Sequence, residues 1–536
     1  MNISWRISAK DALIREIRRI YRPNQLFQAS NIFRGTTKLR HSPELFSSRM
    51  GLILTTLGMA VGTGNIWRFP RILAQNGGGA LIITWLVFLF AWSIRLLILE
   101  FGLGRGARQG CVGAFSKYAG EKLGWMGGFV AFCATAILFY YAVVAGWCLK
   151  YLSASLSGQL KDLAGAPAQE VFVNFANSPW PVLFQFVAIG LAGLVVLRGV
   201  VAGIEKTNRI LIPALFLLLL VALFRTMTLP GSSEGYQFIF SVNWDSLKDS
   251  KVWLEGLSQS AWSTGAGWGL ILTYGVYMPQ KEKIVSTAII TGLGNNLASI
   301  IAACAIIPAV FALAPAVLGE QTLLEMGGVA GFLQNGGPAS TGLTFIWIPA
   351  LFQKMPGGSV FTFLFFLTLF FAALSSLIAM IELAVRVLLD LGLTRKKAVG
   401  IVTSMGFLMG IPSATNLTFF QNQDWVWGVG LMLSGLFVAL AVAFYGPKKF
   451  RREQLAPEES SLLGRGFDFW ILVAIPAQFV GMIVWWFSQS ISWDPDQWWN
   501  PLGTFTIGTA VAQWSLAILV LIFLNLLRVK RKTSRL

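Results

Sequence analysis

The chain has 536 residues, of which 55% are hydrophobic and only 12% are charged, and its mean hydropathy is +0.65. Soluble domains of this length do not carry so much apolar surface, so the composition predicts an integral membrane protein. A net charge of +18 is also seen in nucleic-acid-binding proteins, but here the basic residues lie in short segments between apolar runs and at both ends. Membrane topology explains that pattern better, so we expect the lipid bilayer as a partner and no nucleic acid.

The N-terminal segment, residues 1–47, is polar and basic and lacks the apolar core of a signal peptide. We interpret it as cytoplasmic. An amphipathic helix on an anionic leaflet and a solvated tail both agree with its pattern. The first apolar run after it would then also direct membrane insertion.

That first run contains the stretch GMAVGTGNIWRFP, residues 58–70. Its glycines, asparagine and arginine do not suit an uninterrupted membrane helix, because glycine costs about 1 kcal/mol relative to alanine and a charge in hydrocarbon costs several more. Close helix packing would explain one or two glycines. Three glycines with polar neighbours favour a broken helix, and lipid cannot satisfy the backbone groups that a break frees. The stretch therefore predicts a binding site.

About 20 residues are needed to cross a bilayer, so the apolar runs predict about twelve spanning helices. They lie near residues 50–73, 80–103, 125–154, 180–198, 204–224, 253–278, 284–313, 358–390, 397–413, 425–446, 467–488 and 502–527. Lys and Arg gather in alternate loops, which predicts that both termini lie on the cytoplasmic side. The membrane would be a cell membrane, either a plasma or an inner membrane. Residues 314–357 then form a long external loop.

The sixth run contains SQSAWSTGAGWG, residues 258–269, with a second group of glycines. Broken helices that open two successive five-helix units are typical of an inverted repeat with a midplane substrate site. We therefore predict an all-α integral membrane fold, with a five-plus-five inverted repeat and broken first and sixth helices. The expected parts are the N-terminal segment, two repeats, a final helix pair and a basic cytoplasmic tail: residues 1–47, 48–224, 253–446, 467–527 and 528–536.

At these residues the chain resembles the neurotransmitter:sodium symporter family, in particular its bacterial leucine-transporter-like members. The resemblance runs from Arg49 to about Asp424. Its motifs are SRMGLILTTLGMAVGTGNIWRFP from residue 48, NGGGA at 76–80, LEFGLGR at 99–105, FYY at 139–141, RGVVAGIEK at 198–206 and FFAALSS at 370–376. The resemblance implies sodium-coupled import of a neutral amino acid by alternating access.

The resemblance also implies two sodium sites built from oxygen ligands. One combines backbone carbonyls with two serine hydroxyls, at Gly58, Val61, Ala372, Ser375 and Ser376. The other combines a carbonyl, side-chain oxygens and the substrate carboxylate, at Ala60, Asn65, Ser263 and Asn295. The neighbouring Asn296 leaves the register there open by one residue. A hydroxyl that bonds back to its own helix is the alternative for Ser375 and Ser376.

In the substrate pocket that the resemblance implies, the N–H groups of Thr63 and Gly64 and the hydroxyl of Tyr141 hold the carboxylate. Monoamine carriers of the family have Asp where this chain has Gly62, so Gly62 favours an amino acid. The remaining pocket residues, for which core packing is the alternative, are Ile137, Trp262, Gly265, Trp268, Ser376 and Met380. Two indoles in place of phenyl rings favour a small or medium side chain, although Gly265 returns some space.

The chloride and gate positions are mixed. Ser299 replaces a Glu that is common in bacterial members, as it does in chloride-dependent members, so the resemblance allows chloride at Gln259, Ser263, Asn295 and Ser299. Trp85 argues against chloride, because it replaces a Tyr whose hydroxyl helps to bind the ion. Arg68 and Asp424 match the outer gate, and Asp390 matches the acidic half of the inner gate. Its expected partner position holds Pro43, so either Arg40 substitutes or the inner gate is built differently.

Two other classes of function stay open. A transport-deficient membrane sensor or scaffold would keep the fold, but the sodium hydroxyls and gate residues are largely present. A passive pore would not need paired broken helices and a closing charge pair. An enzyme is not expected, because no nucleophile, base and orienting group form a recognisable arrangement.

Overall fold

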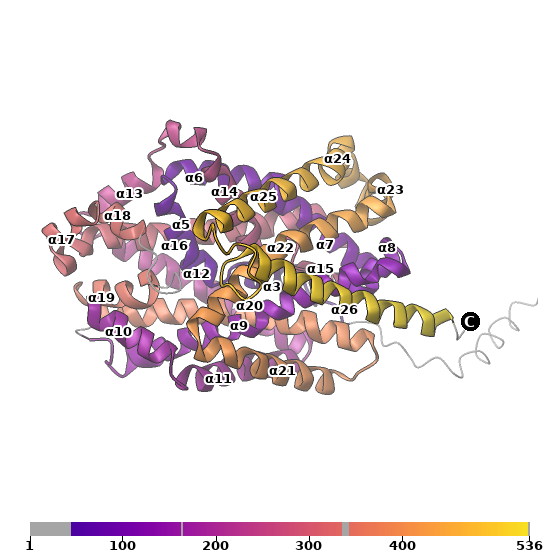
Figure 1. The fold of residues 1–536 in the computed structure, drawn as a ribbon, viewed down its shortest axis with the longest axis horizontal. Coiled ribbons are helices and arrows are strands. Elements are labelled where there is room, and N and C mark those ends of the chain that lie inside the picture. Colours follow the sequence, from indigo (N-terminus) through magenta and orange to yellow (C-terminus); the bar gives the residue numbers. More distant parts are fainter. Residues whose placement is uncertain (1–43, 162–164, 335–341, 534–536) are drawn as a thin grey trace, which may run out of the picture. The chain divides into compact units, whose positions relative to one another are not determined.

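The computed structural model describes residues 44–161, 165–334 and 342–533. Within these ranges the backbone is helical apart from loops and one isolated β-bridge between Gly78 and Val242. Ten of the described helices are long and apolar enough to cross a bilayer, or up to eleven if a bent pair is counted as one span. The predicted all-α, multi-spanning membrane fold is therefore confirmed (Figure 1).

The bent pair is the predicted first break. Helix α3 (Arg49–Ala60) begins at the cap residue Ser48, whose hydroxyl accepts a hydrogen bond from Gly51 N, and ends before Val61. The chain resumes as α4 (Thr63–Ile66) and α5 (Arg68–Gln75) after Gly62. The two halves meet at an angle of 63°.

The second predicted break is also present. Helix α14 (Ser250–Thr264) begins at Asp249, whose carboxylate accepts from Lys251 N, and α15 (Leu270–Val276) follows after five residues. Gly265, Gly267 and Gly269 in the gap have φ of 65°, 86° and 80°. This left-handed region favours glycine, so the glycine pattern itself produces the break. Each half is too short to count as a spanning helix, which explains why the count falls below twelve.

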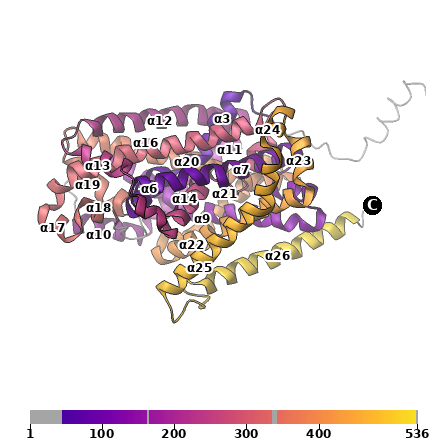
Figure 2. The same cartoon turned by 90° about the horizontal axis from the view of Figure 1, so that it is seen from above.

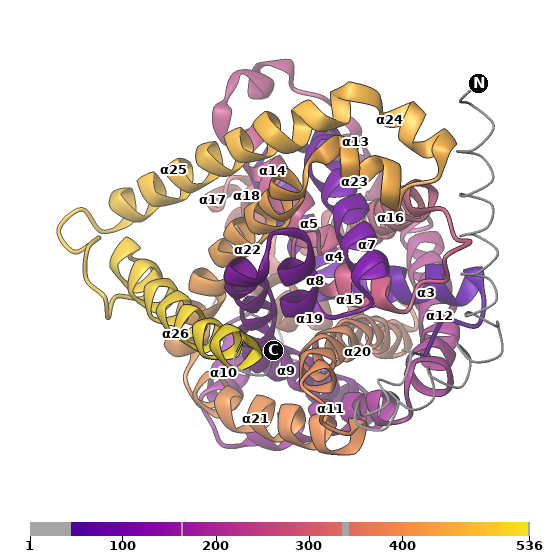
Figure 3. The same ribbon diagram turned by 90° about the vertical axis from the view of Figure 1, so that its right-hand side faces the viewer.

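Long helices surround the two broken ones (Figures 2 and 3). The remaining spans are α6 (Gly79–Phe88) continuing through the π turn η1 (Leu89–Ser93) into α7 (Ile94–Ala107), α9 (Gly124–Leu156), α11 (Trp180–Leu197), η3 (Val200–Glu205) with α12 (Lys206–Met227), α16 (Ile284–Leu318), α20 (Gly358–Asp390), α21 (Arg395–Thr415), α22 (Leu417–Tyr445), α24 (Pro457–Phe469) continuing through the π turn η7 (Trp470–Ala474) into α25 (Ile475–Trp493), and α26 (Ile507–Thr533). Helix α9 packs on α20, α11 and α22, whereas α3 packs on α12, α16 and α20. The shorter helices are α8 (Cys111–Tyr118), η2 (Glu121–Leu123), α10 (Gly165–Ala176), α13 (Ser232–Phe240), η4 (Trp244–Lys248), α17 (Glu320–Glu325), α18 (Gly328–Gln334), η6 (Gly342–Trp347), α19 (Ile348–Gln353) and α23 (Pro447–Gln454).

The predicted long loop, residues 314–357, is largely helical where it is described. It contains α17, α18, η6 and α19, and α18 packs on α5. The side chain of Gln75 donates to Gln334 O over 2.7 Å, and the side chain of Gln334 donates back to Ala74 O over 3.3 Å. The loop thus rests directly on α5, the second half of the first broken helix.

Candidate functional site

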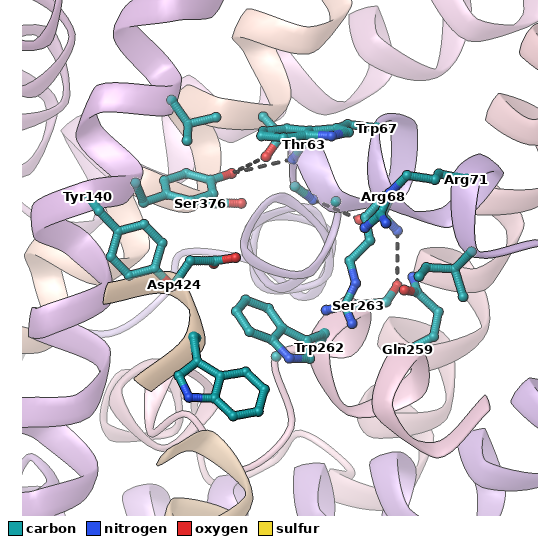
Figure 4. Close-up of a pocket in the computed structure, with 18 of the residues that line it drawn as sticks. Thr63, Trp67, Arg68, Arg71, Tyr140, Gln259, Trp262, Ser263, Ser376 and Asp424 are labelled. Carbon is teal, nitrogen blue, oxygen red and sulfur yellow. Dashed lines mark hydrogen bonds between the residues drawn. The ribbon is translucent and has the colours of Figure 1, made fainter. Parts of the chain in front are cut away.

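A cavity of about 640 Å³ lies between the two breaks, where Thr63, Trp262 and Ser376 face it (Figure 4). It reaches the loop between α25 and α26, since Trp493 and Phe505 also line it. All the predicted substrate residues except Ile137 line it: Gly62, Thr63, Gly64, Tyr141, Trp262, Gly265, Trp268, Ser376 and Met380. Ile137 is fully buried in α9 and is not among the lining residues. The two glycine-rich stretches therefore meet at one hollow, as the sequence predicts.

The first break presents polar groups to this cavity. The hydroxyl of Tyr141 accepts hydrogen bonds from the backbone N and the hydroxyl of Thr63, both over 3.3 Å. A Cβ atom at position 62 would lie 2.9 Å from Ser376 Oγ and 3.2 Å from the Tyr141 hydroxyl oxygen. Gly62 thus keeps open a small space between hydroxyls at the N-terminus of α4. Such a space suits a carboxylate, because helix N-termini and hydroxyl donors both stabilise negative charge.

A compact group of oxygen and amide atoms lies beside the break. The Asn65 amide nitrogen contacts Asn295 Oδ1 over 2.8 Å, and the same Asn295 atom lies 3.0 Å from Ala60 O and 2.9 Å from Ser263 O. With its nitrogen turned toward these carbonyls the Asn295 amide donates to both, and with its oxygen turned toward them it completes an oxygen cluster. Asn295 rather than Asn296 therefore faces the break. Carbonyl, amide and hydroxyl oxygens of low formal charge fit a monovalent hard cation.

The other predicted cation site lies between α3 and α20. Val61, Ala372, Ser375 and Ser376 are all buried. Ser376 Oγ donates across to Met59 O over 3.3 Å, whereas Ser375 Oγ bonds back to Ala372 O in its own helix over 3.1 Å. The residues fit a sodium ion, since the last carbonyls of α3 have no helical partner and α20 brings two hydroxyls beside them.

The predicted outer pair faces the cavity without touching. Arg68 and Asp424 both line it, but no ion pair joins them among the described residues. The Arg68 guanidinium instead donates to Ser258 Oγ over 3.2 Å and lies 5.0 Å above the ring of Trp262. In this arrangement Arg68 and Asp424 do not close the cavity.

Several lining residues were not predicted. Glu255 and Lys251 of α14 face the cavity, as do Trp425, Trp485, Trp486 and Trp493 near the α25–α26 loop. Trp425 lies 4.7 Å from Trp486 and 5.5 Å from Trp493 between ring centroids. Glu255 carried a usable signal, because an acidic residue inside an apolar span marks a functional position. The tryptophans carried none, since they meet only through the packing of α22 on α25.

The opposite end of the two broken helices is packed shut. Phe46 N donates to Tyr277 O over 3.0 Å, and its ring lies edge-on to those of Tyr274 and Tyr277, with centroids 6.0 and 6.3 Å away. Asp390 accepts from Gly110 N over 2.5 Å and forms an ion pair with Arg386. Arg40 and Pro43 lie outside the described residues. Within those described, Asp390 is paired by its own helix, which agrees with an inner gate that is built differently.

The predicted chloride residues form a buried polar group. Ser263 and Ser299 both accept from the Asn65 amide, over 3.2 and 2.7 Å. The Gln259 side-chain oxygen and the indole N–H of Trp85 are both buried without a partner. Trp85 thus retains an unused donor even though it lacks the tyrosine hydroxyl.

The carboxylate of Glu100, which was not predicted as a site residue, supports the second break. Glu100 lies in the LEFGLGR motif, is fully buried and accepts from Gly269 N over 2.6 Å. Its other oxygen has no partner among the described residues. The carboxylate caps the N-terminus of α15, where negative charge is stabilising.

Comparisons with known proteins agree with this architecture. A model described as the sodium:neurotransmitter symporter family matches residues 43–164 and 171–532. The chain is 30% identical over 446 residues to YhdH, an uncharacterised sodium-dependent transporter of Bacillus subtilis, covering 80% of this chain and 93% of that protein. It is 28% identical over 477 residues to the sodium-dependent serotonin transporter of Drosophila melanogaster, covering 79% and 73% respectively. The crystal structure of MhsT in complex with L-phenylalanine matches with a TM-score of 0.71 at 30% identity, covering 82% of this chain and 99% of MhsT.

Proposed function

Because this chain belongs to the sodium:neurotransmitter symporter family, whose members are transporters and not enzymes, we propose that it imports a neutral amino acid in symport with sodium. The observation that carries the substrate class is the space at Gly62. It is bounded by the hydroxyls of Ser376 and Tyr141 and lies at the N-terminus of α4. An α-carboxylate fills that space and accepts from the N–H groups of Thr63 and Gly64.

Two sodium ions are proposed on either side of this carboxylate. One binds at the Ala60, Asn65, Ser263 and Asn295 oxygens and contacts the substrate carboxylate directly. The other binds between the end of α3 and the Ser375 and Ser376 hydroxyls, which requires Ser375 to turn from its intrahelical bond. The first ion couples substrate binding to sodium because it neutralises the substrate carboxylate, whose burial without a cation is costly. Chloride at Gln259, Ser263, Asn295 and Ser299 would balance the added positive charge.

The side-chain end of the pocket favours a small or medium substrate. The rings of Trp262 and Trp268 meet edge to face with centroids 5.6 Å apart, and both residues line the cavity. A Cβ atom at Gly265 would lie only 2.8 Å from Met59 Sδ, so Met59 already fills part of the space that this glycine leaves. MhsT was crystallised with L-phenylalanine. For this chain, two indoles and a methionine around the pocket favour glycine, alanine or a short aliphatic amino acid.

Alternating access follows from the two ends of the cavity. We place the α25–α26 loop outside the cell and the Phe46 end on the cytoplasmic side of a cell membrane. The Lys- and Arg-rich segments gather on the same side as Phe46. The structure then corresponds to a state with the outer pair apart and the inner end packed. Closure brings Arg68 and Asp424 together over the substrate, and release requires Phe46 to leave the tyrosines.

The decisive experiment is a screen of radiolabelled amino acids in proteoliposomes with an imposed sodium gradient. We expect uptake of a small neutral amino acid that is lost in the double variant Ser375→Ala, Ser376→Ala. Thr368→Ala is the matched control, because it removes another hydroxyl of α20, one that bonds to Leu364 O and is not a ligand in the proposed sodium site. Full uptake in potassium medium would contradict the proposal. Sodium-dependent binding without uptake would indicate the transport-deficient sensor instead.

A further inference from the structure

A cationic side chain lies inside the span formed by α6, η1 and α7 without an acidic partner. Arg95 is in the span Gly79–Ala107, and its guanidinium carbon lies 4.5 Å from the centroid of the Trp470 ring. Among the described residues nothing accepts a hydrogen bond from it or forms an ion pair with it, and its Nε is buried without a partner. The contact with Trp470 is therefore its one specific interaction with that part of the protein.

This contact satisfies the face of the guanidinium but not its edge. A guanidinium stays charged in proteins and carries five N–H donors directed in its plane. Stacking on an indole provides cation–π attraction and no hydrogen-bond acceptor. Hydrocarbon provides none either, and an unpaired charge at membrane depth is costly. The five donors of Arg95 thus require an acceptor from outside the described chain.

The backbone on both sides of the contact is shaped in an unusual way. The π turn η1 ends at Ser93, two residues before Arg95, and the π turn η7 begins at Trp470 itself. A π turn inserts one residue into a helix and redirects the side chains next to it, and such turns occur frequently at functional sites. Two of them, from different spans, converge on this single pair of side chains.

The residues around Arg95 and Trp470 indicate what kind of molecule supplies the hydrogen-bond acceptor. Phe90 of η1 and Phe469, Leu472 and Val473 beside Trp470 are all at least two-fifths exposed. Trp470 lies five residues beyond the exposed Arg465, or about 7.5 Å along the helix axis. The long side chain of Arg95, which contacts Trp470, can extend its guanidinium over such a distance toward the nearer membrane surface. The acceptor is thus anionic and belongs to an amphiphile whose chains lie on apolar residues.

We propose that Arg95 and Trp470 form a binding site for an anionic phospholipid of the leaflet nearest Arg465. The lipid phosphate accepts hydrogen bonds from the edge of the Arg95 guanidinium, which matches phosphate geometry in a bidentate manner. Trp470 holds the guanidinium face, and the acyl chains lie on the exposed apolar residues of η1 and η7. The site is separate from the transport cavity and does not rest on the proposed substrate.

The test measures lipid binding to the full-length protein. The purified, delipidated chain is titrated with phosphatidylglycerol, phosphatidylcholine or oleate, and bound lipid is counted by native mass spectrometry. We expect Arg95→Gln to weaken the tightest phosphatidylglycerol site about tenfold and Arg95→Lys to weaken it less, since Lys keeps the charge and loses the planar fork. Arg225→Gln is the matched control, because Arg225 also lies over an aromatic ring, that of Phe361, but donates to Thr228.

Three results would overturn the proposal. They are equal phosphatidylglycerol affinity in the parent and in Arg95→Gln, equal affinity of the parent for phosphatidylglycerol and phosphatidylcholine, and oleate binding that depends on Arg95 as strongly as phospholipid binding does. The second comparison uses only the parent protein, so it decides the matter even if Arg95→Gln does not fold. Trp470→Phe, which keeps a smaller ring, should weaken the same site only a few-fold.

Discussion

The two helix breaks serve one cavity but are built differently. Between α3 and α4 only Val61 and Gly62 leave the helix, with φ of −78° and −101°, values that any residue adopts. Between α14 and α15 five residues leave it, and all three glycines among them have positive φ. The first break therefore depends on its neighbours, whereas the shape of the second is set mainly by the positive φ of its own glycines.

Side chains from other helices also bind freed backbone groups at both breaks, and more of them do so at the first. At the first break they are several side chains, since Gly62 N donates to Asn65, Thr63 N to Tyr141, and Met59 O accepts from Ser376. At the second break Glu100 accepts from Gly269 N. Side-chain changes at the first break should therefore alter binding, whereas added Cβ atoms at the second should alter folding.

The largest effect is expected from Gly267→Ala. Its φ of 86° disfavours any side chain, and the new Cβ would lie 2.6 Å from Gly435 Cα, a backbone atom. The left-handed conformation and the overpacking together cost about 3 kcal/mol or more. We expect loss of monodisperse protein in size-exclusion chromatography. The control is Gly64→Ala at the first break, where no atom lies within 4 Å of the added Cβ; equal stability of the two variants would erase the distinction.

Tyr141→Phe should fold normally and bind substrate poorly. It removes a hydroxyl at the first break that contacts Thr63 N and, in the proposed complex, the carboxylate. Hydrogen bonds to charged groups contribute about 1.5 to 3 kcal/mol, so affinity should fall by about ten- to a hundredfold in equilibrium binding. Tyr151→Phe, in the same helix but outside the cavity lining, should bind as the parent does. Normal affinity in Tyr141→Phe would remove the carboxylate from the first break.

Trp268→Phe tests whether the two breaks bind different parts of the substrate. If the first break holds the head group and the second limits the side chain, the smaller ring should favour larger substrates by about tenfold and leave sodium dependence intact. Competition uptake of alanine against leucine and phenylalanine measures this shift. A parent that already prefers tryptophan or tyrosine over alanine would show that the indoles do not limit the pocket.

Ser299→Glu should have the smallest effect, on the ion response alone. Ser299 is fully buried and accepts from the Asn65 amide, so a carboxylate there would place fixed negative charge beside the first break. Uptake should then depend less on external chloride than it does in the parent. Ser299→Gln is the control of equal size without charge. The same chloride response in all three proteins would count against an anion at this position.

The breaks themselves were predictable because glycines and polar residues stand out in an apolar run. The glycine pattern alone predicted lining residues only in the broken stretches, whereas Tyr141, Ser376 and Met380 lie in unbroken helices and were predicted from the family resemblance. Ile137 lies in α9, an unbroken helix, where a shift of one residue rotates a side chain by about 100°. In the structure Ile137 is fully buried and is not among the residues that line the cavity, and sequence alone does not fix that rotation.

Long-range contacts account for most of what the sequence did not reveal. Glu100 stood in a recognised motif, but its role depends on Gly269, 169 positions away. The tryptophans near the α25–α26 loop depend on the packing of α25, beyond the stretch that carries the family resemblance. The ion pair of Arg386 and Asp390, by contrast, could have been predicted from the sequence, because residues four apart lie side by side on a helix.

The packing of Phe46 has a thermal consequence. Its ring and those of Tyr274 and Tyr277 are each no more than 3% exposed, so opening this end would hydrate three aromatic rings in every cycle. Hydration of apolar surface raises heat capacity, and a step with a heat-capacity change has an activation enthalpy that varies with temperature. If release at this end limits turnover, an Arrhenius plot of uptake should be curved, and Phe46→Ala should make it straighter.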